Sequence, residues 1–172
     1  MIGEIQIRQP SGADGSRIWK LVRETGVLDV NSAYCYMMLE KYFSDTCAVA
    51  QSGDELIGFV SAFIPPRQPD TLFIWQIAVD ARARGEGIGT TLIEHLLERP
   101  TSSEVRYLEA TISPSNSPSI GLFQRFSRQW KASITTSDGF LEDDFPNGNH
   151  EEETLYRIGP FQYQTDRKEI LA

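Results

Sequence analysis

The spacing of hydrophobic residues along the chain predicts strands and helices in alternation. Apolar side chains recur every three to four positions in four segments, which predicts amphipathic helices. These segments are residues 14–25, Ser32 to Phe43, Ile88 to Leu97 and Ser117 to Phe126. Alternating or continuous apolar runs bounded by turn residues predict strands. The predicted strands are residues 5–8, 46–50, 56–64, 71–79, 105–112, 130–136 and 154–158.

The order of these elements predicts an α/β fold with one mixed sheet flanked by helices. Residues 71–79 (TLFIWQIAV) are almost continuously apolar, which is typical of a central strand buried on both faces. Ser117 is expected to cap the last helix, with Pro118 at its first position. A length of 172 residues favours a single domain over residues 1–172.

The amino-acid composition limits the kinds of molecule that the protein is expected to bind. Lys and Arg number 16 against 24 Asp and Glu, a net charge of −8, which argues against nucleic-acid binding and suits a cationic substrate. No apolar run approaches the roughly 18 residues of a membrane span, so no membrane association is expected. Cys35 and Cys47 lack the spacing of a disulfide scaffold or zinc site, and we expect two reduced thiols in a cytoplasmic protein.

A glycine-rich turn follows the apolar strand and precedes a helix. Gly85, Gly87 and Gly89 would let the backbone approach an anion, and the helix N-terminus would offer unpaired N–H groups to a phosphate. Arg84 adds positive charge. The turn is neither a Walker loop, since no Lys follows the glycines, nor a GxGxxG fingerprint, since its glycines are spaced by two.

The pattern R-x-x-G-x-G at Arg84–Gly89 resembles the pyrophosphate-binding loop of the GCN5-related N-acetyltransferase (GNAT) superfamily. Residues 116–123 are similar to a second family feature, in which Asn116 would face the pantetheine arm. The resemblance implies the GNAT fold and acetyl-coenzyme A as acetyl donor. Phe123 departs from the family, which often has there a Tyr that protonates the leaving thiolate. The resemblance assigns the following residues to the cofactor: Ile77, Ala78, Val79, Arg84, Gly85, Glu86, Gly87, Ile88, Gly89, Thr90, Asn116 and Phe123.

Three segments, residues 28–36, 69–79 and 108–116, are similar to the narrower family of L-2,4-diaminobutyrate acetyltransferases of ectoine biosynthesis. That resemblance implies the following substrate contacts: Asp29, Tyr34, Trp75, His150 and Glu153. Each has an alternative explanation. Asp29 could begin a turn, Tyr34 and Trp75 could be core residues, His150 could be an exposed loop residue, and Glu153 belongs to an acidic stretch that could be a solvated loop.

The implied reaction is direct attack of the γ-amine on the acetyl thioester. The amine has a pKa near ~10, so about one molecule in a thousand has it neutral at pH 7, and a base must take the proton. The candidate bases are Glu153, His150, Glu109 and Asp29, and the sequence leaves their order open. A backbone N–H near residues 77–79 would polarise the thioester carbonyl. We expect no metal, because no His, Cys and carboxylate cluster has ligand spacing.

Two other functions remain open at this point. The chain could acetylate a different small amine, or it could be a non-catalytic module that senses acyl-coenzyme A. Thiol release from acetyl-coenzyme A across a panel of diamines would separate these possibilities. Because dimers are common in the superfamily, we expect a homodimer.

Overall fold

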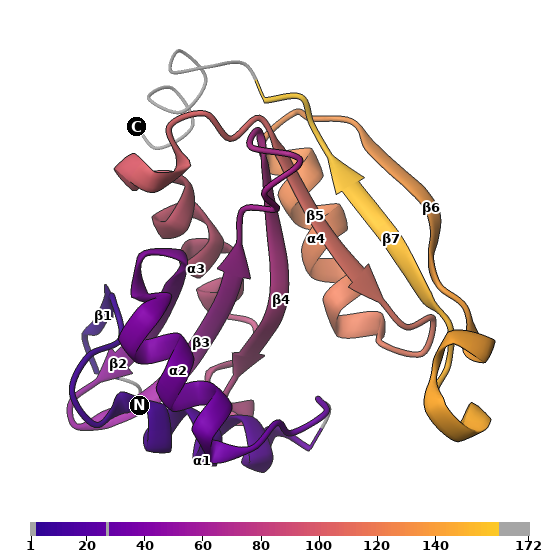
Figure 1. Cartoon of the computed structure of the whole chain (residues 1–172). Helices are drawn as coiled ribbons and strands as arrows, with labels where there is room; N and C mark the ends of the chain where they lie inside the picture. The colour runs from indigo at the N-terminus through magenta and orange to yellow at the C-terminus, as the bar shows by residue number, and fades with distance from the viewer. Residues whose placement is uncertain (1–2, 27, 162–172) are drawn as a thin grey trace. The chain divides into compact units, whose positions relative to one another are not determined.

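Seven strands form one mixed sheet in the computed structural model, which describes residues 3–26 and 28–161 (Figure 1). Their order is β1-β2-β3-β4-β5-β7-β6. β4 pairs with β5 in parallel, whereas the β1–β2, β2–β3, β5–β7 and β6–β7 pairs are antiparallel. The strands are β1 (Ile5–Arg8), β2 (Cys47–Ser52), β3 (Glu55–Phe63), β4 (Thr71–Val79), β5 (Tyr107–Ile112), β6 (Ile134–Phe140) and β7 (Glu153–Ile158). The predicted α/β class with a single mixed sheet is confirmed.

Four α-helices lie within the described residues, and the chain divides into two compact units. The helices are α1 (Asp14–Thr25), α2 (Ala33–Tyr42), α3 (Ile88–Leu97) and α4 (Ser117–Gln129). The first unit holds the residues up to Phe63 and Ile74–Ser103, and the second holds Ile64–Phe73 and the residues from Glu104. Strand β4 contributes to both units, and the single domain over residues 1–172 stays a prediction. Residues 1–2, 27 and 162–172 of that range lie outside the described residues.

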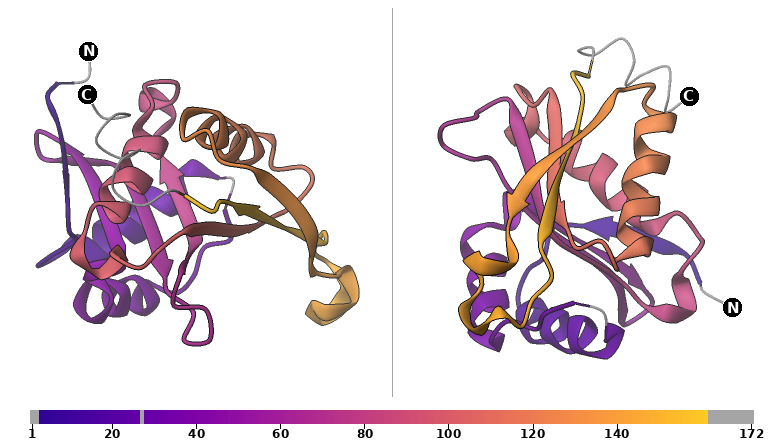
Figure 2. Two further views of the ribbon diagram at one scale, coloured as in Figure 1. Left: turned by 90° about the horizontal axis from the view of Figure 1, so that it is seen from above. Right: turned by 90° about the vertical axis from the view of Figure 1, so that its right-hand side faces the viewer.

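In the first unit, α1 and α2 cover one face of the strands and α3 covers the other (Figure 2). The core under α1 and α2 is built from apolar side chains of both helices and of β2, β3 and β4. Helices α1 and α2 approach closely at Gly15, where a Cβ would lie 2.8 Å from the Cα of Met37. A side chain at position 15 would therefore push the two helices apart.

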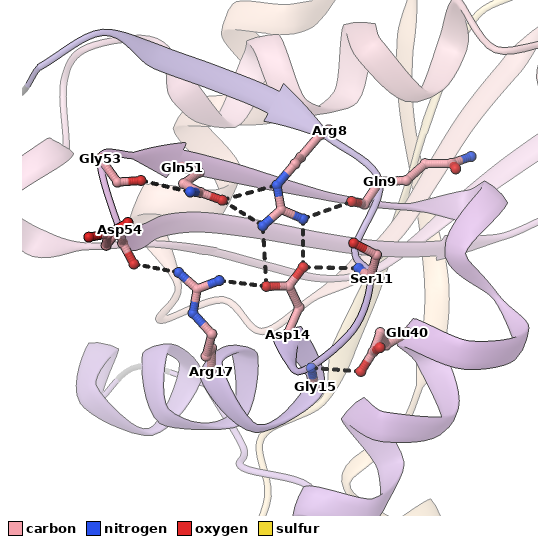
Figure 3. A network of polar contacts seen from close by, with 10 residues as sticks. All are labelled: Arg8, Gln9, Ser11, Asp14, Gly15, Arg17, Glu40, Gln51, Gly53 and Asp54. Atoms are coloured by element: carbon pink, nitrogen blue, oxygen red, sulfur yellow. Dashed lines mark hydrogen bonds and ion pairs between the residues drawn. The ribbon is translucent and has the colours of Figure 1, made fainter.

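A polar network ties the start of α1 to the edge of the sheet (Figure 3). Asp14 is buried and pairs with Arg8 of β1 at 2.5 Å and with Arg17 at 2.7 Å. The side chain of Glu40, on α2, accepts a hydrogen bond from the N–H of Gly15 at 3.0 Å. Burial alone would raise the pKa of Asp14, but hydrogen bonds from Arg8 and Ser11 and the nearby positive charges lower it.

In the second unit, α4 packs against β7, and an aromatic cluster joins the end of α4 to Phe161, which follows β7. The rings of Phe126 and Trp130 stack with centroids 5.2 Å apart, and Phe161 contacts both edge-on. The strand predicted over residues 130–136 exists but lies later in the chain, at Ile134–Phe140, because Trp130 is the C-cap of α4. The helix cap was also misplaced: the side chain of Asn116, not Ser117, accepts the hydrogen bond from the N–H of Ser119.

None of the helices described in residues 3–26 and 28–161 is long and apolar enough to cross a membrane.

Candidate active site

The glycine-rich turn leads directly into α3. Gly85 and Gly87 have φ angles of +87° and +79°, a backbone conformation that favours glycine, and Gly87 is the N-cap of the helix. No side chain of the described residues caps this end, so the first-turn N–H groups face outward from the helix start. The buried hydroxyl of Thr90, in this first turn, has no hydrogen-bond partner among the described residues. The turn therefore has the unpaired donors and the positive dipole end that an anionic group requires.

Strand β4 has one buried and one partly open face, which corrects the expectation of a strand buried on both faces. Leu72, Ile74, Gln76 and Ala78 are buried, whereas the alternate positions Phe73, Ile77 and Val79 are half-buried. Trp75 lies on the open face with 46% of its surface exposed. Because an indole of this size is normally covered in a core, the interpretation of Trp75 as plain core is wrong.

Tyr34 is also outside the core. It lies in the first turn of α2, and 67% of its surface is exposed. The tyrosine that packs inside is Tyr36, two positions further along the same helix, which is fully buried against Phe59. Tyr34 therefore remains available for a contact with a ligand.

A buried hydrogen-bond relay connects β4 to the segment before α2. The hydroxyl of Tyr36 donates to Oε1 of Gln76 at 3.0 Å, and Nε2 of Gln76 donates to the carbonyl oxygen of Asp29 at 2.8 Å. The Tyr36 hydroxyl also accepts from the N–H of Asn31 at 3.3 Å. The relay fixes the main chain at Asp29, so that its carboxylate is carried by an anchored segment.

This relay was not predicted from the sequence. Its one available signal was Gln76, the single polar side chain within an otherwise apolar strand centre, FIWQIAV. A buried amide has four hydrogen-bonding capacities to satisfy, so its presence there indicates specific partners.

In the second unit, His150 and Glu153 lie together at the start of β7. Nε2 of His150 lies 3.9 Å from Oε1 of Glu153, and the same oxygen accepts a hydrogen bond from the hydroxyl of Ser113 at 3.2 Å. The His150 ring stacks on Phe145 with centroids 4.1 Å apart. The side chain of Glu153 is 20% exposed. These two residues are thus partly covered and held, unlike the exposed acids Glu142, Asp143 and Asp144 of the same stretch.

Glu109 lies elsewhere in the second unit, where its buried carboxylate pairs with a half-buried arginine. Its Oε1 accepts a charge-assisted hydrogen bond from the guanidinium of Arg157, which also contacts the Thr71 hydroxyl and covers the Tyr107 ring. Glu109 and Arg157 are cross-strand partners in the β5–β7 ladder. Because these residues are 48 positions apart, no local sequence pattern indicates the pair. Glu109 therefore has a partner that holds its charge and its position.

The two cofactor candidates on α4 differ in exposure. Asn116 caps the helix through Oδ1, so its amide nitrogen can still donate to a ligand. Phe123 is 1% exposed and packs in the core of the second unit, which leaves almost no surface for a ligand.

Neither thiol has the low pKa of a reactive cysteine. Burial raises the pKa of the Cys47 thiol to about 12, so it is unreactive at neutral pH. Burial also raises the pKa of Cys35. Within residues 3–26 and 28–161, no group of three or more His, Cys, Asp or Glu side chains could hold a metal ion.

Comparisons with known proteins identify relatives over nearly the whole chain. The acetyltransferase (GNAT) family matches residues 17–127. The chain is 46% identical over 160 residues to an L-2,4-diaminobutyric acid acetyltransferase of Marinococcus halophilus, covering 93% of this chain and 92% of the relative. A protein of the same name from Halomonas elongata is 46% identical over 157 residues, covering 91% and 81%.

A solved structure resembles the fold closely. Diaminobutyrate acetyltransferase from Paenibacillus lautus, in complex with its substrate L-2,4-diaminobutyric acid and coenzyme A, is 42% identical with a TM-score of 0.89. The match covers 94% of this chain and 98% of that chain.

Proposed function

The chain belongs to the acetyltransferase (GNAT) family, and from this premise we propose that it is an L-2,4-diaminobutyrate acetyltransferase. It transfers the acetyl group of acetyl-coenzyme A to the γ-amine and forms N4-acetyl-L-2,4-diaminobutyrate, a step of ectoine biosynthesis. The observation that carries the proposal is the 42–46% identity, over more than nine-tenths of the chain, to proteins of that name.

The turn before α3 fits the pyrophosphate of coenzyme A. Its support is the pair of left-handed glycines, Gly85 and Gly87, the uncapped helix start and the unpartnered hydroxyl of Thr90. In this proposal the N–H groups of Ile88 and Gly89 donate to the phosphate oxygens, and exposed Arg84 adds positive charge. When bound, acetyl-coenzyme A supplies the activated acetyl thioester.

The substrate carries two ammonium groups and one carboxylate, so its site needs both acceptors and donors. We assign Asp29 as an ammonium ligand, supported by the relay that anchors its main chain to Gln76. The exposed rings of Tyr34 and Trp75 would contact the substrate, and their exposure is what supports this role. The backbone N–H groups of Ile77 and Val79, in β4, are candidates to polarise the thioester carbonyl.

Glu153 is our candidate for the base that takes the proton from the γ-ammonium. Its support is a partly exposed carboxylate with Ser113 and His150 beside one oxygen. Glu109 would have to give up its ion pair with Arg157 to accept a proton, which makes it the weaker candidate. His150 would then orient the Glu153 carboxylate or the substrate carboxylate. Phe123 cannot donate a proton, so the thiolate leaves unassisted or with another donor, which a thiol of pKa near ~8.5 tolerates.

A cytoplasmic location and a homodimer complete the proposal. The first rests on two free thiols, Cys35 and Cys47, which suit a reducing compartment. The second rests on the resemblance to the superfamily and is tested by the mass of the protein in solution.

The experiment is thiol release from acetyl-coenzyme A across a panel of amines. We expect kcat/KM for L-2,4-diaminobutyrate to exceed that for ornithine and putrescine by at least tenfold. A preference for another amine would contradict the assignment of diaminobutyrate as substrate, while the protein would still be an N-acetyltransferase. No thiol release with any amine, in a folded protein that binds coenzyme A, would favour a non-catalytic module.

A further inference from the structure

Glu153 begins β7 opposite an irregularity in β6. Asp138 pairs with Thr154 and Phe140 pairs with Glu153, so Gly139 is an extra residue on the β6 side of the ladder. Such a bulge bends its strand and changes the direction of the neighbouring side chains. The bulge therefore lies directly beside the carboxylate that we assign as the base.

Only a glycine fits at position 139. A Cβ there would collide with the carbonyl oxygen of Glu153 and lie 3.1 Å from a methyl group of Thr111 and 3.2 Å from the N–H nitrogen of Leu155. The first and last of these are backbone atoms of β7, which cannot move without displacing Glu153 itself. Position 139 therefore requires a glycine because its Cα lies so close to the main chain of Glu153.

A serine hydroxyl holds the side-chain carboxylate of Glu153. Ser113 follows β5, and its Oγ donates to Oε1 of Glu153 at 3.2 Å. The nearby Nε2 of His150 also lies beside Oε1, at 3.9 Å. Both contacts involve Oε1, so a proton from the amine meets less competition at Oε2.

We propose that Ser113 and Gly139 are positioning residues for the acetyl transfer, which hold the Glu153 main chain and carboxylate so that Oε2 receives the proton of the amine. The inference rests on the proposed function. It adds two residues that touch no reacting atom and act through Glu153.

The same loop provides a matched control. Ser115 donates from its hydroxyl and from its N–H to Oε2 of Glu151, at 2.7 and 3.3 Å. Ser113→Ala and Ser115→Ala each delete one hydroxyl and one Ser–Glu hydrogen bond from one segment. They differ in whether the glutamate that loses its partner is the proposed base.

The first test is steady-state kinetics with both substrates for Ser113→Ala, Ser113→Thr and Ser115→Ala. We expect Ser113→Ala to lower kcat at least tenfold with the KM for acetyl-coenzyme A unchanged. Ser113→Thr keeps the hydroxyl and is expected to restore kcat to within threefold, and Ser115→Ala to stay within twofold of the parent. Equal kcat values for the two alanine variants would overturn the inference.

The second test is Gly139→Ala beside Gly121→Ala. Gly121 lies on α4, and a Cβ there meets no atom within 4 Å. We expect Gly139→Ala to lower kcat at least tenfold while coenzyme A binding is kept, and Gly121→Ala to change neither. If Gly139→Ala does not fold, the kinetics of Ser113→Ala and Ser115→Ala alone decide whether the positioning role holds.

Different results would refute the positioning role and the proposed function. If the parent protein acetylates diaminobutyrate and Ser113→Ala equals it, only the positioning role is refuted. If the parent protein releases no thiol with diaminobutyrate, the proposed function itself is refuted.

Discussion

Replacing Tyr36 by Phe tests whether the buried relay holds the Asp29 segment in place. The substitution removes one hydroxyl and keeps the ring that contacts Phe59 edge-on. In the parent, that hydroxyl donates to Gln76 at 3.0 Å and accepts from the N–H of Asn31 at 3.3 Å. Gln76 in turn donates to the Asp29 carbonyl at 2.8 Å.

The size of the effect follows from what the variant leaves unpaired. Oε1 of Gln76 would lose its partner at a residue that is only 8% exposed, and a buried unsatisfied acceptor costs about 1–3 kcal/mol. Asn31 is half-buried, so water can replace its lost bond at little cost. We therefore expect the free energy of unfolding to fall by about 1.5–3 kcal/mol.

The kinetic consequence should be specific to one substrate. A less firmly held Asp29 raises the KM for diaminobutyrate about three- to tenfold, equivalent to about 0.7–1.4 kcal/mol. The KM for acetyl-coenzyme A should stay within twofold, because the relay joins Tyr36, Gln76 and the Asp29 segment, whereas coenzyme A is assigned to the turn before α3.

Urea denaturation and steady-state kinetics in both substrates measure these effects. Tyr42→Phe is the control, since Tyr42 lies on the same helix with its side chain exposed; we expect its stability to change by less than about 0.5 kcal/mol. The reasoning is refuted if Tyr36→Phe matches this control in stability and also keeps the parent KM for diaminobutyrate.

Three further changes test separate parts of the account. Gly87→Asp adds bulk and negative charge where φ is +79°, and we expect the Kd of coenzyme A, by calorimetry, to rise at least tenfold; an unchanged Kd in a folded variant contradicts the loop assignment. Asp29→Asn removes a charge-assisted hydrogen bond of roughly 1.5–3 kcal/mol, so the KM for diaminobutyrate should rise about 10- to 100-fold with that for acetyl-coenzyme A unchanged; a rise under twofold removes Asp29 as a ligand. Asp14→Asn should lower the free energy of unfolding at pH 7 by about 3 kcal/mol, because Arg8 and Arg17 lose their partner. Since the pKa of Asp14 is lowered in the folded state, its contribution is present above about pH 4 and is lost as the pH falls through the folded value; a difference between parent and variant that persists at lower pH contradicts this.

Local patterns predicted most elements because their signals lie within one segment. The alternation in residues 5–8, the helical spacing of residues 14–25 and the apolar run of residues 71–79 match β1, α1 and β4 in their bounds. The strand expected over residues 130–136 was placed too early, because an apolar residue such as Trp130 suits either a strand or the end of a helix. In the structure its N–H donates to the carbonyl oxygen of Phe126, which shows that it ends the helix.

Long-range pairing accounts for what the sequence could not predict at the candidate site. The partners of Glu109 and Gln76 are 40 or more positions away, and the ladder register of β6 and β7 decides that Gly139 opposes Glu153. With the strand predicted too early, Gly139 fell outside it and could not be recognised as a bulge. The exposure of Trp75 likewise depends on which face of β4 is covered, which its own apolar neighbours do not reveal.

The identity of the product formed from acetyl-coenzyme A and L-2,4-diaminobutyrate decides whether the protein is a diaminobutyrate acetyltransferase. We expect one thiol to be released per acetyl group transferred, and a proton NMR spectrum in which the γ-CH₂ signal next to the nitrogen shifts as an amide forms. Acetylation of the α-amine, or turnover with another amine but none with diaminobutyrate, would contradict this assignment.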